Sequence, residues 1–354
     1  MRINLCDDSF MVVKKVLIVC ALIWCTLSVL ARSTSPGQII DARLSSLTSA
    51  GQFSGTVLIA RTETILLRKG YGFANLEKRI PFTPNTSHHV ASISKMFTAM
   101  TVLKLRDQQR LKLEDLICKY LENCPKVWQN ITIQNLIHHT SGIPDYEEKL
   151  GLYSSAYLKF MTKKNATTKI ILQAQKQKLE FQPNTQFRYS NTGYVLLSSI
   201  VEKVAGKPFN QAVHDLILSP AGLKNTGMFE PEMTGISSGY TKNWKSIPKL
   251  ALTPPAGDAA LVSTLDDLYR WSQLMDARDD AEVFKAGLGG YGMGWFIDRR
   301  FNRKRYIHTG ELPGYRTVFV KYPSEKITII LFSNQDQAPT ETVTRDITKL
   351  LLNP

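Results

Sequence analysis

Two apolar runs near the start of the chain, residues 54–60 and 63–68, predict a pair of β-strands joined by a tight connection at Arg61-Thr62. Strand-like runs return near the other end, where residues 327–332 (Ile-Thr-Ile-Ile-Leu-Phe) are the clearest. These later runs cover residues 292–298, 304–308, 314–322 and 326–333. The pattern therefore predicts β-structure at both ends of the chain.

Between these runs, apolar residues recur with the spacing of helices. The predicted helices cover residues 92–107, 133–138, 166–177, 190–204, 208–217 and 265–276, and a final amphipathic helix covers 339–352. Strands at both ends around a helical middle predict one α/β region, formed by 32–90 with 285–354, into which a helical region, 91–284, is inserted. We expect the active site between the two regions.

The first 31 residues are typical of an export signal. Lys14 and Lys15 precede an apolar run over residues 16–31, and small side chains near its end suit cleavage before Arg32. The run is shorter than the roughly 20 residues that span a bilayer comfortably. We therefore expect an exported protein, periplasmic or secreted. An uncleaved signal that anchors the chain to the membrane through residues 16–31 remains the alternative.

Composition supports a folded protein without assigning a function to it. The 354 residues carry 44 Lys+Arg against 30 Asp+Glu, a formal charge of +14, and 43% are hydrophobic, which is enough for a sizeable core. The basic residues are dispersed and nucleic-acid-binding motifs are absent, so no nucleic-acid partner is expected. The charge suits anionic polymers of a cell envelope, which keeps a catalytically silent envelope-binding protein as a competing hypothesis.

Removal of the signal would leave two of the five cysteines, Cys118 and Cys124. An even pair in an exported chain predicts a disulfide around a small loop, with two free buried thiols as the alternative. A metal site is not predicted, because two cysteines without neighbouring histidines cannot complete a tetrahedral ligand set.

The first candidate for chemistry is Ser92-Ile-Ser-Lys95, where a polar loop turns into a predicted helix. Residues at i and i+3 share one helix face, so the lysine amine can reach the serine hydroxyl. A lysine whose pKa is lowered by burial or nearby positive charge can take the serine proton and create a nucleophile. Ser246-Ile-Pro-Lys249 matches the same pattern, but Pro248 inside the would-be turn predicts a loop there.

The second candidate element is Tyr189-Ser190-Asn191, which opens a predicted helix. A tyrosine beside Lys95 would have its phenolate favoured and could carry protons to and from Ser92. We expect Asn191 either to hold the carbonyl side of a substrate or to anchor Lys95. A helix-capping asparagine is the structural alternative.

The third candidate element is His308-Thr309-Gly310, followed by Glu311, at a predicted strand. A strand that runs past a nucleophile can offer a backbone N–H to an oxyanion, here from Glu311 together with the amide of Ser92. Taken alone, the motif is also typical of a strand that ends in a turn.

In this order and spacing, the three elements resemble the serine β-lactamase and penicillin-binding protein superfamily. The closest likeness is the class C branch, with its D-alanyl-D-alanine carboxypeptidases, esterases and β-lactamases. The resemblance covers most of residues 50–335 and extends to the segments Phe53-Ser-Gly-Thr-Val-Leu-Ile-Ala, His139-Thr-Ser-Gly-Ile-Pro-Asp, Gly257-Asp-Ala-Ala-Leu-Val-Ser-Thr and Tyr291-Gly-Met-Gly-Trp. It implies an α+β fold, in which an antiparallel β-sheet is flanked by N- and C-terminal helices and carries an inserted all-helical region.

The resemblance also implies a role for each motif. Ser92 would be acylated, Lys95 would activate it, and Tyr189 would act as the general base. The substrate-binding positions would be Asn191, His308, Thr309, Gly310 and Glu311. This mechanism requires neither a cofactor nor a metal.

One departure from the pattern bears on the substrate. The β-lactamases of this branch usually carry lysine where this chain has His308, and histidine there resembles the carboxypeptidase and esterase members. Since histidine is charged only part of the time near neutral pH, it is the weaker partner for a substrate carboxylate. We therefore expect an acyl-enzyme serine hydrolase of D-Ala-D-Ala carboxypeptidase or esterase type, with β-lactamase activity as the alternative. Its partners would be small peptides or esters, including peptidoglycan, with β-lactams as acylating ligands.

A rival serine site is Gly-Ile-Ser237-Ser-Gly, which matches the nucleophile elbow of α/β-hydrolases, with Asp266 and His308 in the right order. That elbow needs a strand before it and a helix after it, and neither flank qualifies. We interpret Asp266 instead as a helix N-cap near Thr264. The histidine pair at 138–139 lacks metal-ligand spacing and is interpreted as packing beside the cleft.

Overall fold

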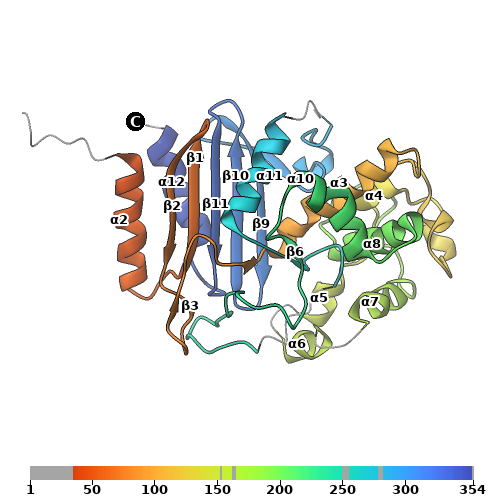
Figure 1. Ribbon diagram of the computed structural model, residues 1–354. Coiled ribbons are helices and arrows are strands. Elements are labelled where there is room, and N and C mark those ends of the chain that lie inside the picture. The colour runs from red at the N-terminus through yellow and green to blue at the C-terminus, as the bar shows by residue number, and fades with distance from the viewer. Residues whose placement is uncertain (1–34, 152–153, 162–164, 249–254, 278–281, 353–354) are drawn as a thin grey trace, which may run out of the picture.

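The computed structural model describes residues 35–151, 154–161, 165–248, 255–277 and 282–352 (Figure 1). The predicted signal over residues 1–31 and Lys249 of the second Ser-x-x-Lys match lie outside the described residues. Within the described part of the chain, no helix is long and apolar enough to cross a membrane.

A six-stranded antiparallel sheet forms the centre of the fold, in the order β2-β1-β11-β10-β9-β8. Its strands are β1 Gly55–Arg61, β2 Thr64–Tyr71, β8 Phe296–Arg300, β9 Arg303–Leu312, β10 Tyr315–Tyr322 and β11 Ile327–Ser333. β1 pairs with β11, and Gly55 lies opposite Ser333, so strands from both ends of the chain share one sheet. The predicted α+β class with an antiparallel sheet is confirmed.

Different helices cover the two faces of this sheet. On one face, Ile59 of β1 belongs to a core shared with α2 (Pro36–Ser49) and α12 (Thr340–Leu352), the two helices on the left of Figure 1. On the other face, the adjacent Leu58 belongs to the core of the helical region. Because successive side chains of a strand point to opposite faces, a strand buried on both sides is apolar throughout. This explains the continuous apolar runs in the sequence.

The helical region packs around α3, which is buried along most of its length and contacts α8. Its helices are α3 Ser94–Asp107, α4 Ile133–Ile137, α5 Tyr146–Leu150, α6 Ser155–Met161, α7 Ala166–Ala174, α8 Asn191–Ala205, α9 Phe209–Val213, α10 Ser219–Ala221 and α11 Leu265–Ala277. Short strands pair nearby, namely β3 Phe73–Asn75 with β4 Ile80–Pro81, and β7 Leu261–Ser263 with β5 His88–His89 and β6 Gly227–Met228.

Two predicted elements differ from the structure in their extent or continuity. The helix predicted over 208–217 is divided into α9, a π-helical turn at His214–Leu218, and α10. Pro220 follows this turn and has no N–H to donate, so the regular bonding pattern cannot continue through it. The strand predicted over 292–298 begins at Phe296 as β8.

Asp266 does not cap α11, so that interpretation is wrong. The hydroxyl of Thr264 accepts the N–H of Asp267 at 3.4 Å, whereas the Asp266 carboxylate pairs with Arg68 on β2. Thr264 precedes the helix, where a side-chain oxygen can reach the first free N–H groups, whereas Asp266 already lies within the first turn.

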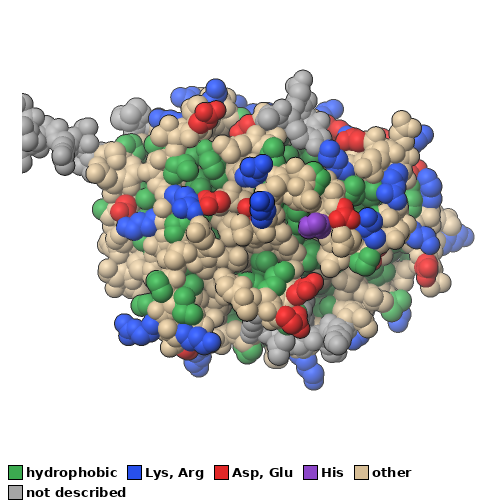
Figure 2. Space-filling model, viewed as in Figure 1, with side chains coloured by type: hydrophobic (Ala, Val, Ile, Leu, Met, Phe, Trp, Pro, Cys, Tyr) green, Lys and Arg blue, Asp and Glu red, His purple; other side chains and the backbone are tan. Residues whose placement is uncertain are grey.

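Cys118 and Cys124 form a disulfide, with their sulfur atoms 1.99 Å apart, that closes a short loop. Lys and Arg side chains are scattered over the face seen in Figure 2, with Asp and Glu side chains between them. Among the described residues, no group of three or more His, Cys, Asp or Glu side chains is arranged to hold a metal ion.

Candidate active site

Ser92 lies in a 3-10 turn, Ala91–Ile93, immediately before α3 rather than in the helix itself. Ala91 has a φ of +50°, a conformation that residues other than glycine rarely adopt. This conformation interrupts a right-handed helix. Gly310 of β9 runs against this turn, since a Cβ atom there would lie 2.4 Å from the carbonyl oxygen of Val90. The turn and the strand together hold Ser92 in place.

The serine opens onto a cavity of about 540 Å³ between the sheet and the helical region. The cavity is lined by Ser92, Asp145, Glu147, Glu148, Gly151, Tyr189, Asn191, Phe296, His308, Thr309 and Glu311. The three motifs selected from the sequence therefore meet at one place, although they are far apart along the chain.

Lys95, in the first turn of α3, is fully buried beside the serine. Its Nζ lies 3.1 Å from Ser92 Oγ, 2.7 Å from Asn191 Oδ1 and 3.0 Å from the carbonyl oxygen of Asp258. The asparagine and carbonyl oxygens can only accept hydrogen bonds. A neutral Lys95 would therefore give both its N–H groups to them and turn its lone pair toward the serine hydroxyl.

Burial lowers the pKa of Lys95, because the ammonium loses its hydration. The negative charges of Asp258, Glu147 and Asp145 act in the opposite direction, but the downward shift prevails. The lysine is therefore suited to accept a proton from the serine.

Tyr189 precedes α8, with the centre of its ring 5.1 Å from Lys95 Nζ and 4.2 Å from the ring of His139. Burial raises the pKa of its hydroxyl well above the ordinary value, although a hydrogen bond with Ser92 acts the other way. The expectation of a favoured phenolate is therefore wrong, and the phenol keeps its proton at rest. A protonated phenol beside the serine can still give a proton to a leaving group and recover it afterwards.

Asn191 is the first residue of α8, and its amide joins Lys95 to two carboxylates. Its Oδ1 accepts from Lys95, while its Nδ2 donates to Asp145 Oδ2 at 3.0 Å and to Glu147 Oε2 at 2.9 Å. Its backbone N–H also donates to Asp145 Oδ2, at 3.1 Å. The structure shows that Asn191 anchors Lys95 and that it does not cap the helix, while its contact with a substrate carbonyl stays a prediction.

His308 on β9 is buried and neutral. Its Nδ1 lies 2.7 Å from the carbonyl oxygen of Thr309, which can only accept, so Nδ1 carries the proton and Nε2 accepts from the Tyr291 hydroxyl at 3.0 Å. Burial, together with the positive charge of Lys95, lowers the pKa of His308 to about 3. The expectation that this histidine is charged part of the time near neutral pH is therefore wrong.

The rest of the third motif follows the edge of the cavity. Thr309 and Glu311 line it, and Gly310 lies between them against the turn that carries Ser92. The Glu311 carboxylate pairs with Arg316 of β10 at 2.5 Å. The strand thus passes the serine, while the oxyanion role of the Ser92 and Glu311 amides stays a prediction.

Three buried or nearly buried carboxylates near Lys95 were not predicted from the sequence. Asp145 caps α5 by accepting the N–H of Glu147 at 2.9 Å, and burial raises its pKa. Burial also raises the pKa of Glu147 to about 8 and that of Asp258 to about 6. An aspartate before a short helix is a recognisable N-cap signal, whereas Glu147 and Asp258 reach Lys95 only through the tertiary fold.

Ser237 is a buried structural residue. Its Oγ lies 2.7 Å from Nδ1 of His88, whose Nε2 lies 3.1 Å from the carbonyl oxygen of Ser333. The imidazole therefore donates to the carbonyl and accepts from the serine. Asp266 and His308 have the other partners described above, and Ser237 does not line the cavity at Ser92. The structure does not assemble the rival site.

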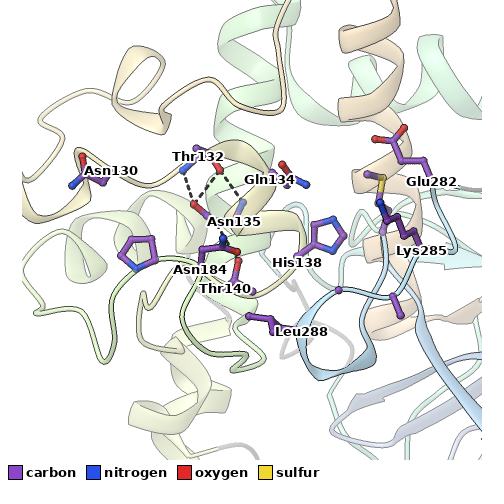
Figure 3. A pocket seen from close by; sticks show the side chains of 14 residues that line it. Asn130, Thr132, Gln134, Asn135, His138, Thr140, Asn184, Glu282, Lys285 and Leu288 are labelled. Carbon is purple, nitrogen blue, oxygen red and sulfur yellow. Dashed lines mark hydrogen bonds between the residues drawn. The ribbon is translucent and has the colours of Figure 1, made fainter.

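A separate cavity of about 530 Å³ lies beside α4, and amide and hydroxyl side chains form part of its lining (Figure 3). Asn135 accepts the N–H of Thr132 at 3.0 Å and donates to the hydroxyl of Thr140 at 3.1 Å. Nδ1 of His138 lies 3.2 Å from the carbonyl oxygen of Tyr291. Asn135 thus links Thr132 to Thr140, and His138 supports the segment that carries Tyr291, in keeping with a packing role for His138.

Comparisons with known proteins agree with this geometry. A family model described as Beta-lactamase matches residues 40–353. A penicillin-binding protein of Bacillus subtilis is 29% identical over 81% of this chain and 69% of its own length. A D-aminopeptidase of Gluconobacter oxydans is 27% identical over 80% of this chain, which spans only 56% of that relative. The crystal structure of a penicillin binding protein from Bacillus halodurans superposes with a TM-score of 0.76 at 25% identity, covering 87% of this chain and 98% of that one. The chain belongs to the Beta-lactamase family and is a serine hydrolase.

Proposed function

We propose that this protein is an exported hydrolase that forms an acyl-enzyme on Ser92 and cleaves ester, amide or peptide substrates, with D-Ala-D-Ala-type peptides ranked after substrates that lack a carboxylate next to the cleaved bond. The observation that carries the proposal is the contact of 3.1 Å between Lys95 Nζ and Ser92 Oγ. The two other partners of this amine accept hydrogen bonds only, so the lone pair of a neutral Lys95 faces the serine proton.

The chemistry follows from this contact. Lys95 takes the proton of Ser92 as Oγ forms a bond to the substrate carbonyl carbon, and the carbonyl oxygen becomes an oxyanion held by the amides of Ser92 and Glu311. As the carbon–nitrogen or carbon–oxygen bond breaks, the phenol of Tyr189 protonates the leaving group and is reprotonated from Lys95. Water then attacks the ester on Ser92 while the same groups take one of its protons, and they pass this proton to Ser92 Oγ as the bond between Oγ and the acyl carbon breaks.

The charges around the cavity bear on the substrate class. Asp145, Glu147, Glu148 and Glu311 line it, and its described lining contains no lysine or arginine. A neutral His308 adds no positive charge for a substrate carboxylate. An acidic lining without a cation among its described residues supports esters, and peptides or amides that lack a carboxylate next to the cleaved bond, over carboxypeptidase substrates. β-Lactams, which carry a carboxylate, rank second to these esters and amides. The similarity to a D-aminopeptidase supports the same order.

β-Lactam acylation remains the second candidate, because the chain resembles penicillin-binding proteins over most of its length. Export is supported by the signal pattern of residues 1–31 and by the disulfide between Cys118 and Cys124, a bond that persists in oxidising compartments. The alternative of a membrane anchor at residues 16–31 is tested by the mass of the mature protein.

The deciding experiment is the intact mass of the purified mature protein after exposure to a fluorophosphonate and, separately, to a fluorescent penicillin. Ser92→Ala should abolish the adduct, and Ser237→Ala, the matched control, should retain it. Labelling by the fluorophosphonate alone would favour an ester or amide substrate. Labelling by both reagents would favour a peptide of the cell wall as the substrate. Absence of any adduct on folded wild-type protein would overturn the proposal in favour of a catalytically silent envelope-binding protein.

A further inference from the structure

The carboxylates around Lys95 differ in the number of hydrogen bonds that they accept. Asp145 accepts the N–H of Glu147 at 2.9 Å, the backbone N–H of Asn191 at 3.1 Å and its side-chain amide at 3.0 Å. Glu147 accepts from the same amide at 2.9 Å and from the hydroxyl of Tyr157 at 3.1 Å. Each of these two groups therefore has at least two donors.

Asp258 has fewer partners than either of them. Its side chain is fully buried, its Oδ2 accepts from the Tyr146 hydroxyl at 2.7 Å, and its Oδ1 has no hydrogen-bond partner among the described residues. A buried carboxylate with a single neutral donor is costly to ionise unless a cation lies nearby. The nearby cation is Lys95, whose amine donates to the backbone carbonyl of the same residue.

Hydrogen bonds hold the segment that carries Asp258 against the start of α3. The hydroxyl of Thr98 donates to the carbonyl oxygen of Gly257 at 2.6 Å, and the N–H of Leu261 donates to Ser94 Oγ at 3.0 Å. Gly257 has a φ of +95°, and a Cβ atom there would lie 2.2 Å from the carbonyl oxygen of Tyr194. These contacts hold the segment against α3 and α8, so the carboxylate of Asp258 is kept buried beside Lys95.

We infer that Asp258 is a positioning residue that sets the protonation of Lys95, its buried carboxylate serving as the counter-charge that decides when the amine becomes a base. The inference rests on the proposed role of Lys95 in activating Ser92. The groups that face Lys95 from the surrounding elements are Ser92, Asp258, Asp145, Glu147, Asn191, Tyr189, Tyr194, His139 and His308.

The sign of the effect follows from electrostatics. An ionised Asp258 favours the ammonium form of Lys95 and raises its pKa, in opposition to burial. Loss of that charge lowers the pKa of Lys95, so the neutral amine persists to lower pH. The acid limb of the pH–rate profile should then move to lower pH, while the rate at alkaline pH, where Lys95 is neutral in both proteins, should change little.

The test is the second-order rate constant for fluorophosphonate labelling of Ser92 as a function of pH in the wild-type protein and in Asp258→Asn. We expect the midpoint of the acid limb to fall by about one pH unit. Asp266→Asn is the matched control, because it removes an exposed carboxylate that pairs with Arg68, and its midpoint should stay in place. An unmoved or raised midpoint in Asp258→Asn would overturn the inference. So would a lower alkaline rate with no shift, which is the mark of a purely structural residue.

Tyr146→Phe provides a second route if Asp258→Asn does not fold. Removal of the hydroxyl withdraws the single donor to Asp258, which raises the pKa of that carboxyl and leaves it neutral more often. The acid limb should move in the same direction by a smaller amount, and an unchanged limb contradicts the inference. Labelling that survives Ser92→Ala would instead defeat the proposed function itself, so the two failures are distinguishable.

Discussion

Nε2 of His308 lies 3.0 Å from the hydroxyl of Tyr291, and this hydrogen bond fixes a neutral imidazole beside the cavity. The other ring nitrogen donates to the carbonyl oxygen of Thr309, so both nitrogens are satisfied without an extra proton. Burial and then the positive charge of Lys95 lower the pKa of His308 to about 3, and protonation would also place a donor at Nε2, where the ring now accepts.

A lysine at this position should change the response to β-lactams. His308→Lys would place a cation on the wall of the cavity that Ser92 also lines, where it could attract a β-lactam carboxylate, and that charge would also lower the pKa of Lys95. We expect acylation by benzylpenicillin to become about tenfold faster, which corresponds to one charge-assisted contact. The measurement is the second-order rate constant of acylation, with His308→Gln as the uncharged control. Unchanged or slower acylation in the lysine variant would count against this prediction.

Tyr189→Phe should keep the fold and lose turnover. The variant retains the ring that packs at 4.2 Å on His139 and removes only the proton-carrying hydroxyl. General acid–base catalysis of this kind contributes roughly 10²–10⁴-fold, so kcat for an ester should fall by that factor with little change in KM. Steady-state kinetics on a chromogenic ester measure both constants. If kcat stays within a few-fold of wild type, Tyr189 does not carry the proton.

Gly310→Ala should disturb the site through sterics. A Cβ atom at Gly310 would lie 2.2 Å from Thr317 Oγ1 and 2.4 Å from the carbonyl oxygen of Val90, so the turn at Ser92 would have to shift. We expect a loss of about 2 kcal/mol in the free energy of unfolding, typical of overpacking, and a drop in activity. Gly193→Ala in α8 is the matched control, because its nearest neighbour would be at 3.4 Å and alanine favours helices. Equal behaviour of the two variants in urea unfolding would contradict the prediction.

Stability should fall in acid because of His88. Its pKa is lowered to about 3 by burial, so between the ordinary value of 6.5 and about 3 the unfolded chain binds a proton that the folded protein does not. The contribution of His88 to the free energy of unfolding is therefore complete above pH 6.5. It is lost as the pH falls, at up to about 1.4 kcal/mol per pH unit. Urea unfolding at pH 7, 5 and 4 measures the slope. His88→Gln should make the slope of the free energy of unfolding against pH shallower, whatever the effect of the substitution on stability at pH 7. An equally steep slope in the variant would show that His88 does not cause the loss of stability in acid.

The elements that could be predicted from the sequence are those with a strong local pattern. The runs over 54–60 and 326–333 are apolar on both faces and became central strands, and the spacing of Ser92 and Lys95 placed the amine beside the hydroxyl. The N-terminal helix α2 was expected only through the resemblance, because its buried face is a narrow stripe that includes Ile40 and Leu44.

What could not be predicted depends on burial and on contacts between distant segments. Tyr189 was expected as a phenolate and His308 as a partial cation, and both interpretations failed because the sequence does not show how completely a side chain loses water. Glu147 and Asp258 come to Lys95 from separate parts of the chain. Asp258 lies in the segment 257–264 that resembles the family, but the segment does not show that its carboxylate is buried near Lys95. Charge states of this kind follow from the tertiary structure.

The pairing of β1 with β11 has a consequence for how the protein is made. Because the strand nearest the N-terminus completes its pairing only with the last strand of the sheet, the nascent chain cannot close the sheet until synthesis is almost finished. Contacts between such distant segments form slowly, and they are absent from a chain still emerging from a ribosome. The enzyme should therefore be inert while it is being synthesised and acquire reactivity only after the full chain has folded.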